Sequence, residues 1–201
     1  CNVCLKIFYK NNMPYSSFIF DKSIEKVIRL LKPKSILDIG AGAGKYGELV
    51  KKIDPFFETV AVEIEKDYIK KFDLSSIYDK VWNISATDLI SPKYYDLSFD
   101  VIMIGDIIEH LKKSDGIDLL NFLIYRCRWI IVEFPHRYLQ NSVDGYQSEA
   151  HISVWTKDDF SSFEATKLSE RDTQRLVVLR GYLENEISVT EIESLLSKNE
   201  K

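Results

Sequence analysis

The stretch from Ser35 to Gly44, which reads SILDIGAGAG, constrains the fold of this chain more than any other segment. Its first half, Ser35 to Ile39, is a short apolar run that is typical of a buried strand. Alternating glycines follow, and the pattern from Lys45 to Lys52 indicates the start of a helix. A strand that enters a helix through a glycine loop exposes backbone N–H groups beside the positive end of the helix dipole. The segment therefore predicts a ligand-binding turn.

Strand and helix patterns alternate along the rest of the chain. Strands are predicted at residues 35–39, 59–63, 80–83, 99–104 and 129–134, and at 176–179 with a partner at 165–169. Helices are predicted just before Pro33 and at residues 45–52, 66–72 and 188–198. A further helix is predicted from the apolar spacing of Ile117, Leu120, Ile124 and Cys127, which would form its core face. A near capping box at Thr156 predicts a short helix that ends near Phe163. This alternation predicts an α/β fold, a Rossmann-like doubly wound sheet with helices on both faces. The sheet is expected to be mostly parallel, with an antiparallel pair at its C-terminal edge.

Two phosphate-binding motifs can be compared with the glycine loop. A Walker A loop needs four residues between its glycines and a Ser or Thr after the Lys, whereas Gly40 to Gly44 is one residue too short and Tyr46 stands at the hydroxyl position. The dinucleotide fingerprint G-x-G-x-x-G is matched literally from Gly42 to Gly47, and Glu63 lies about 20 residues further on. That register leaves Asp38 unexplained, since a buried strand should still be apolar there. A nicotinamide-dependent oxidoreductase remains an alternative.

A third interpretation explains Asp38 as well as the glycines. The order D-x-G-x-G-x-G from Asp38 to Gly44 resembles motif I of class I S-adenosylmethionine-dependent methyltransferases. The resemblance extends from about Ile24 to Phe160. It includes the acid Glu63 at the end of the second strand, Asp88 after the third, and the Asp-Ile-Ile-Glu-His stretch that begins at Asp106.

The resemblance implies S-adenosylmethionine as the cofactor and assigns residues to its parts. The strand-end acid Asp38 and the loop would lie against the methionine moiety, Glu63 would accept hydrogen bonds from the ribose, Asp88 would bind the adenine amino group, and Asp106 would line the methionine pocket. The predicted cofactor-binding residues are Asp38, Gly40, Ala41, Gly42, Gly44, Glu63, Ile64, Asp88, Leu89 and Asp106.

The candidate catalytic residues lie in the loops after the fourth and fifth strands. All three histidines of the chain, His110, His136 and His151, fall there, and a neutral imidazole can serve as a base near neutral pH. This region resembles a subset of class I enzymes with a Pro-His turn and a His-x-Ser-x-Trp segment. Candidate substrate-binding residues are Tyr138, Tyr146 and Trp155, and no metal site is predicted.

Length and charge bound the remaining predictions. The 201 residues suit a single methyltransferase domain, with residues 1–20 as a candidate lid and 188–201 as a terminal helix. A net charge of −4 offers no general attraction to nucleic acid. No apolar run approaches the ~18 residues of a membrane span, and Cys1 and Cys4 are expected to be ordinary thiols, so a cytoplasmic protein is expected.

These observations predict a methyltransferase that acts on a small-molecule or saccharide-type acceptor, with O-methylation favoured by the absence of an Asn/Asp-Pro-Pro-Tyr/Phe signature. Besides the oxidoreductase, two alternatives stay open. The chain could be a catalytically silent methyltransferase fold that serves as a binding protein, or an RNA methyltransferase. The sequence does not indicate an oligomeric state.

Overall fold

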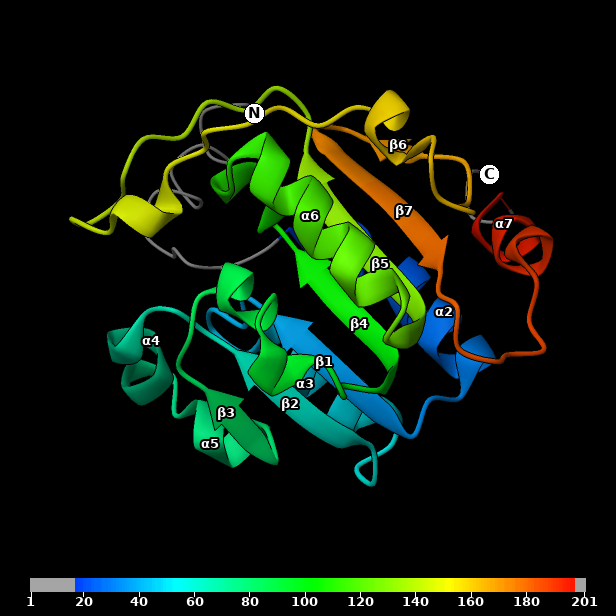
Figure 1. Cartoon of the computed structure of the whole chain (residues 1–201), viewed down its shortest axis with the longest axis horizontal. Helices are drawn as coiled ribbons and strands as arrows, with labels where there is room; N and C mark the ends of the chain where they lie inside the picture. Colours follow the sequence, from blue (N-terminus) through cyan, green and yellow to red (C-terminus); the bar gives the residue numbers. More distant parts are fainter. Residues whose placement is uncertain (1–16, 198–201) are drawn as a thin grey trace, which may run out of the picture.

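The structure, a computed structural model, describes residues 17–197 and is built on a seven-stranded sheet with the order β3-β2-β1-β4-β5-β7-β6 (Figure 1). The strands are β1 (Ser35–Ile39), β2 (Glu58–Val62), β3 (Lys80–Trp82), β4 (Phe99–Gly105), β5 (Cys127–Pro135), β6 (Ser169–Arg171) and β7 (Gln174–Arg180). The first five strands pair in parallel, and β7 pairs antiparallel with both β5 and β6. The predicted mostly parallel sheet with an antiparallel edge pair is confirmed.

Helices cover both faces of this sheet. The α-helices are α2 (Asp21–Leu31), α3 (Lys45–Ile53), α4 (Lys66–Lys71), α5 (Leu74–Ile77), α6 (Lys113–Ile124) and α7 (Val189–Ser197). Figure 1 shows α6 lying across β4 and β5 on the near face, with α2 on the far side and α7 beside β7. The doubly wound arrangement predicted from the alternation is therefore present.

The period-2 alternation within the strands divides the core into two layers. In β1, Leu37 and Ile39 belong to the cluster that packs against Leu119, Leu120 and Leu123 of α6. Their neighbour in the strand, Ile36, belongs to the opposite cluster, which includes residues of α2, α3 and α7. Because successive strand residues point to opposite faces, both faces of a central strand are apolar and both need a helical cover.

Two predicted elements are corrected by the structure. Cys127 is not on the core face of α6, which ends at Ile124; it is the first residue of β5 and pairs with Phe99. The edge strand β6 lies at Ser169–Arg171 rather than at 165–169, where Ala165 makes only an isolated bridge to Leu179. The capping box at Thr156 is present, with Asp159 as its acid, but it opens the short 3₁₀ helix η6 (Lys157–Phe160).

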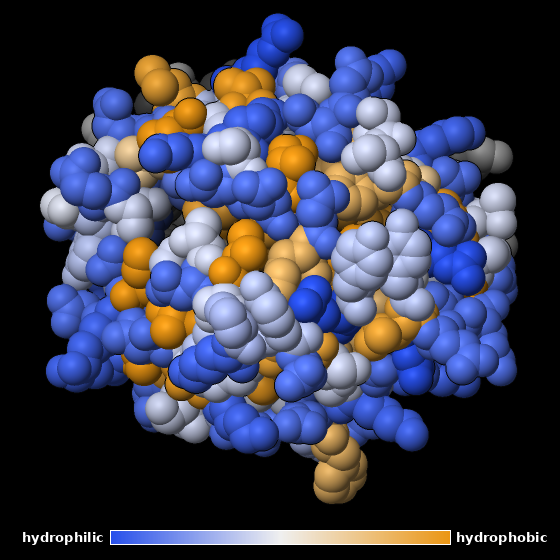
Figure 2. Space-filling view, in the orientation of Figure 1, coloured by the Kyte–Doolittle hydropathy of each residue, from blue (hydrophilic) through white to orange (hydrophobic). Residues whose placement is uncertain are grey.

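The ends of the chain and its surface complete the description. Residues 1–16 and 198–201 lie outside the described part, and with them Cys1, Cys4, most of the proposed lid and the last residues of the terminal helix. Figure 2 shows hydrophilic side chains over most of one face, with apolar groups between them. Among helices within residues 17–197, none combines the length and apolar character that crossing a bilayer requires.

Candidate functional site

The site lies at the carboxyl ends of β1 and β4, where the strand order reverses direction. The chain runs outward from β1 to β2 and β3, then returns to the other side of β1 with β4 and β5. In open α/β sheets, the loops that leave the strands at such a switch point diverge, and ligands bind in the crevice outside the carboxyl ends of the strands. The glycine loop follows β1, and the Asp106–His110 stretch follows β4.

The glycine loop has a backbone that other residues would adopt only with strain. Gly40 and Gly44 have φ values of +76° and +83°, in the left-handed region that favours glycine. A Cβ atom on Gly40 would also lie 1.9 Å from the Cδ1 atom of Ile107, so the loops after β1 and β4 are in direct contact. Gly44 is the N-cap of α3, and this places the start of the helix at the crevice.

Asp38 is a buried carboxyl group with one unpartnered oxygen. It is 1% exposed, and its Oδ2 atom accepts a hydrogen bond from the hydroxyl of Tyr78. Its Oδ1 atom is buried and accepts no hydrogen bond from any residue between 17 and 197. Burial raises the pKa of Asp38 to about 7, although the hydrogen bond from Tyr78 acts in the opposite direction. A buried acceptor without a hydrogen bond is costly in free energy, and a cationic donor would satisfy it.

Glu63 follows β2 and holds the glycine loop in place. Its Oε2 atom accepts a hydrogen bond from the backbone N–H of Gly42 at 2.8 Å, and its Oε1 atom accepts one from Glu65 at 2.8 Å. Each carboxylate oxygen can accept a second bond, so the group retains capacity for a ligand. The next residue, Ile64, exposes 52% of its surface beside it.

The remaining predicted cofactor residues differ in exposure. Asp88 is exposed and forms the capping box of the short helix η2 (Ala86–Leu89) with Ser85. Leu89 is fully buried in the core. Asp106 has a left-handed backbone with φ of +52° and accepts a hydrogen bond from the backbone N–H of Ser17 at 3.2 Å.

A second buried carboxyl group, Glu133 in β5, lies behind Asp106. It is 1% exposed, accepts a hydrogen bond from the Tyr46 hydroxyl at 2.6 Å and has the Nζ atom of Lys45 at 3.9 Å. Burial raises the pKa of Glu133 to about 8, against the effect of Lys45. The same lysine forms an ion pair with Asp21 at 2.6 Å, so it links α2, α3 and β5.

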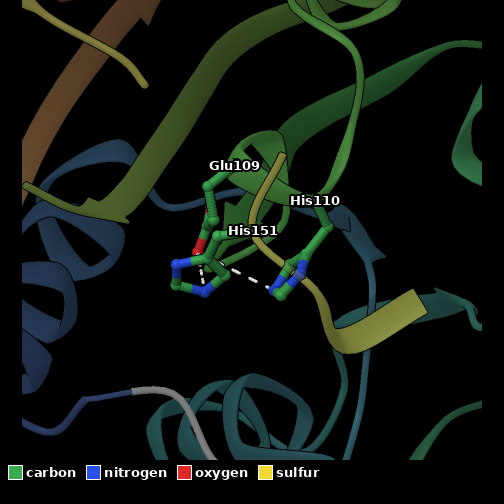
Figure 3. Close-up of side chains that lie close together, drawn as sticks. All are labelled: Glu109, His110 and His151. Atoms are coloured by element: carbon green, nitrogen blue, oxygen red, sulfur yellow. Dashed lines mark ion pairs between the residues drawn. The ribbon is translucent and has the colours of Figure 1, made fainter. Parts of the chain in front are cut away.

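Three side chains that can ligate a metal or transfer a proton lie close together beyond the end of β4. Glu109 and His110 belong to the loop after β4, and His151 comes from the segment after β5. Glu109 is 2% exposed, and its Oε1 atom lies 3.9 Å from the Nε2 atoms of both His110 and His151 (Figure 3). The two imidazole rings are 4.7 Å apart between centroids and lie edge to face. One potential ligand atom from each of the three residues lies within 4.8 Å of the others.

Backbone carbonyls fix the orientation of both imidazoles. The Nδ1 atom of His110 lies 3.2 Å from the Ala150 carbonyl, and the Nδ1 atom of His151 lies 2.7 Å from the Tyr138 carbonyl. A carbonyl only accepts, so each Nδ1 carries the proton when it bonds to these carbonyls, and each Nε2 lies 3.9 Å from the Oε1 atom of Glu109. Burial lowers the pKa of His110 to about 4 and also lowers that of His151, so both rings are neutral.

The segment that carries His151 is pinned onto the 3₁₀ helix η4 (Ile108–His110). The backbone N–H groups of Ile152 and Ser153 donate to the Glu109 carbonyl at 2.8 and 3.1 Å. The indole N–H of Trp155 donates to the Ile108 carbonyl at 2.9 Å. These bonds explain why residues more than 40 positions apart in the sequence converge on one point.

The other predicted residues take different positions. His136 follows β5, where its backbone pairs with Thr173, and it is not part of the cluster. Tyr138 is 55% exposed and packs its ring edge to face with His151 at 5.7 Å. Tyr146 packs against Tyr68 near the start of α4. Trp155 is 1% exposed and packs against Phe160, with ring centroids 5.6 Å apart and a tilted arrangement.

Some groups at the site carry no sequence signal of their own. Tyr78 and Glu133 lie in no motif, and only the fold brings them to Asp38 and Lys45. Glu109 stands in the Asp-Ile-Ile-Glu-His stretch, but its burial and its contact with two histidines could not be inferred from the sequence.

Neither a protein-family model nor a curated protein matches the sequence. Among solved structures, a SAM-dependent methyltransferase from Archaeoglobus fulgidus is 17% identical, with a TM-score of 0.57 over 80% of this chain and 94% of that one. An O-methyltransferase described as putative, from Nostoc punctiforme, is 15% identical, with a TM-score of 0.58 over 89% and 67%. The plantazolicin methyltransferase BpumL in complex with SAH is 16% identical, with a TM-score of 0.57 over 82% and 83%. These similarities show that the chain has the class I methyltransferase fold, as the resemblance in sequence implied.

Proposed function

We propose that this protein is an S-adenosylmethionine-dependent methyltransferase whose acceptor is an oxygen atom of a small molecule or saccharide. The observation that carries the proposal is the buried Asp38 carboxyl group, with one oxygen unpartnered at the end of β1 beside the glycine loop. An amino-acid ligand carries an ammonium group, which is the donor that such an oxygen requires.

The residues present fit this cofactor part by part. Asp38 would bind the ammonium group, the glycine loop would let the methionine moiety approach the backbone, and Glu63 would accept hydrogen bonds from the ribose. The exposed side chain of Ile64 offers an apolar surface next to Glu63 for the adenine ring. When bound, S-adenosylmethionine supplies a sulfonium methyl group, which an acceptor oxygen takes with its lone pair while sulfur keeps the electrons of the broken C–S bond.

The chain's own part in the reaction is to hold the two reactants in line. A hydroxyl acceptor must also lose its proton as it attacks, and a neutral imidazole within reach can accept it. Burial lowers the pKa of both His110 and His151, which favours the neutral imidazole. His110 donates its backbone N–H to Ile107, whose side chain touches the glycine loop, and the ring of His151 packs against that of His110. Tyr138 packs against His151, and Tyr146 packs against Tyr68 of α4; both are candidates for contact with the acceptor.

Calorimetry with S-adenosylhomocysteine and with NAD tests the cofactor. We expect S-adenosylhomocysteine to bind and NAD not to bind. The Asp38→Asn variant keeps the size of the side chain but removes its charge, so we expect affinity for S-adenosylhomocysteine to fall about 10- to 100-fold, as loss of a charge-assisted hydrogen bond predicts. Glu48→Gln, which changes an exposed acid on α3, is the matched control and should bind like the wild type. Binding of NAD alone would favour the oxidoreductase.

Turnover with labelled S-adenosylmethionine tests the acceptor. We expect label to enter a phenol or glycoside as an ether that resists mild acid and base. Transfer to RNA, with binding that weakens as salt rises, would replace this acceptor class by nucleic acid. Binding of S-adenosylhomocysteine without transfer to any acceptor would identify a silent fold that serves as a binding protein.

A further inference from the structure

We infer that Glu109, His110 and His151 form a binding site for one divalent transition-metal ion, with coordination positions left open for an acceptor oxygen. The inference deepens the proposed function and rests on it for the role of the ion, although not for its binding. No metal is expected from the sequence, in which Glu109 and His110 lie more than 40 residues from His151.

The first argument is the distance between the ligand atoms. Metal–ligand bonds to imidazole nitrogen and carboxylate oxygen are about 2.1 Å long, so two ligands of one ion lie about 3 to 4 Å apart. The Oε1 atom of Glu109 is 3.9 Å from each of the two Nε2 atoms. These two separations are too long for hydrogen bonds and fall within that range, and all three ligand atoms lie within 4.8 Å of one another, so a small adjustment of the side chains would place an ion between them (Figure 3).

The second argument is the unsatisfied carboxyl group of Glu109. The residue is 2% exposed, and both of its carboxyl oxygens are buried without a hydrogen-bond partner in the described part of the chain. Within residues 17–197, no Lys or Arg forms an ion pair with it, and its electrostatic neighbours include further carboxyl groups, those of Asp106, Glu133 and Glu149. A buried carboxylate is normally paired or coordinates a metal, and here a cation is the missing partner.

The third argument is the support behind the imidazoles. Metal-binding histidines usually donate their second ring N–H to a carbonyl or carboxylate, which fixes the tautomer and aims the other nitrogen at the ion. Both His110 and His151 have this arrangement, through the carbonyls of Ala150 and Tyr138. The hydrogen bonds of Ile152 and Ser153 to Glu109 hold the two ligand-bearing segments together.

The types of ligand atom determine which ions the site would prefer and what role the ion could have. Two imidazoles with one carboxylate suit Mn²⁺, Fe²⁺, Co²⁺ or Zn²⁺, whereas Mg²⁺ and Ca²⁺ prefer oxygen ligands. Three protein ligands leave at least one position open for an acceptor hydroxyl. Because the ion would take the Nε2 lone pairs of both histidines, the ion itself, in place of a free imidazole, would orient that hydroxyl and lower its pKa. The site follows β4 directly, and Ile107 joins it to the glycine loop.

Titration of the chelator-treated full chain with Mn²⁺ and Co²⁺ tests the site without any need for turnover. We expect one ion per chain and, for Co²⁺, a visible absorption band from imidazole coordination. If neither Mn²⁺ nor Co²⁺ binds to the folded wild-type protein with one ion per chain, the inference is overturned. S-adenosylhomocysteine binding is measured in parallel, because its retention without metal binding removes the metal site alone and leaves the proposed cofactor intact.

Three variants remove one ligand each while keeping the local hydrogen bonds. In His110→Asn and His151→Asn, the amide N–H takes the place of Nδ1–H and can still donate to the same carbonyl, but the Nε2 ligand is gone. Glu109→Gln keeps the shape of the side chain and removes its charge. We expect each variant to weaken Mn²⁺ binding more than 10-fold with an unchanged circular dichroism spectrum. His136→Asn, which lies outside the cluster, is the control and should retain Mn²⁺ binding; equal loss in it would show adventitious binding by histidine.

Discussion

At the scale of single residues, the site is organised around acids that the fold buries. The D-x-G-x-G-x-G pattern was enough to find Asp38, because the acid and the glycines are close in sequence. It could not find Tyr78, which lies 40 residues away and donates to Asp38 while accepting from the backbone N–H of Gly47. Partners of this kind belong to no local pattern, since they are defined only once the sheet has formed.

Replacement of Tyr78 by Phe should destabilise the protein and weaken its affinity for S-adenosylhomocysteine. The ring would still fill its space, but the buried Asp38 carboxyl and the Gly47 N–H would both lose a partner. A buried group left unsatisfied costs about 1–3 kcal/mol, and urea unfolding at neutral pH measures it. The same hydrogen bond lowers the pKa of Asp38, so less of the carboxylate would be ionised to bind an ammonium group.

Tyr95→Phe is the matched control for this change. Tyr95 is 53% exposed, and substitutions at such surface positions usually change stability by no more than about 0.5 kcal/mol. Equal stability of Tyr78→Phe and Tyr95→Phe would show that the hydroxyl of Tyr78 makes no net contribution.

At the scale of elements, hydrophobic periodicity located the strands well and misplaced some boundaries. Cys127 stands three residues after Ile124, which fits a helix, yet the helix ends there because the next residues enter β5 and pair with β4. The spacing of apolar residues cannot show whether Cys127 continues the helix or begins a strand, since strand pairing is a contact between segments that are distant in sequence. The predicted position of the edge strand differs from that of β6 for a similar reason. This strand pairs only with β7, and a single antiparallel partner constrains its register weakly.

Gly116→Ala should loosen the contact between α6 and the segment that carries His151. A Cβ atom at Gly116 would lie 2.5 Å from the Cζ2 atom of the buried Trp155, so the ring or the helix would have to move. Overpacking of this kind costs about 1–3 kcal/mol, which exceeds the gain of about 0.5–1 kcal/mol from replacing glycine within a helix. We expect a lower urea midpoint and weaker Mn²⁺ binding.

The control for Gly116→Ala is Asp118→Ala, at an exposed position of the same helix. It improves helix propensity without meeting Trp155, so its stability should equal or exceed that of the wild type. A Gly116→Ala variant as stable as Asp118→Ala would contradict the packing argument.

At the scale of the whole molecule, the strand order decides which loops meet. Alternation of strands and helices was enough to predict that loops at the carboxyl ends share one edge of the sheet. It could not show that His110 and His151 converge while His136 stays apart, because this depends on the irregular path of residues 136–155. Loop conformation follows from individual hydrogen bonds, such as those to the Glu109 carbonyl, and these leave no periodic signal in the sequence.

The same architecture collects buried acids, and this predicts how stability depends on pH. Burial raises the pKa of Asp38 to about 7, that of Glu133 to about 8, and that of Glu109 well above its usual range. The folded state therefore holds protons that the unfolded chain has already released, and its stability falls as pH rises through these values. The lowered pKa values of His110 and His151 act in the opposite direction, but that effect is mostly complete by pH 7.

We therefore expect the free energy of unfolding of the metal-free protein to fall by roughly 2 to 4 kcal/mol between pH 6.5 and 8, as measured by urea denaturation at each pH. Asp38→Asn and Glu133→Gln should each flatten this dependence, because neither amide titrates. Glu191→Gln is the control: the acid is exposed, its pKa is lowered by hydrogen bonds from Ser188, and its removal should leave the slope between pH 6.5 and 8 unchanged. A free energy of unfolding that stays constant or rises over this interval would mean that the buried carboxyl groups are already ionised at pH 6.5, and that the fold supplies them with partners beyond Tyr78, Tyr46 and Lys45.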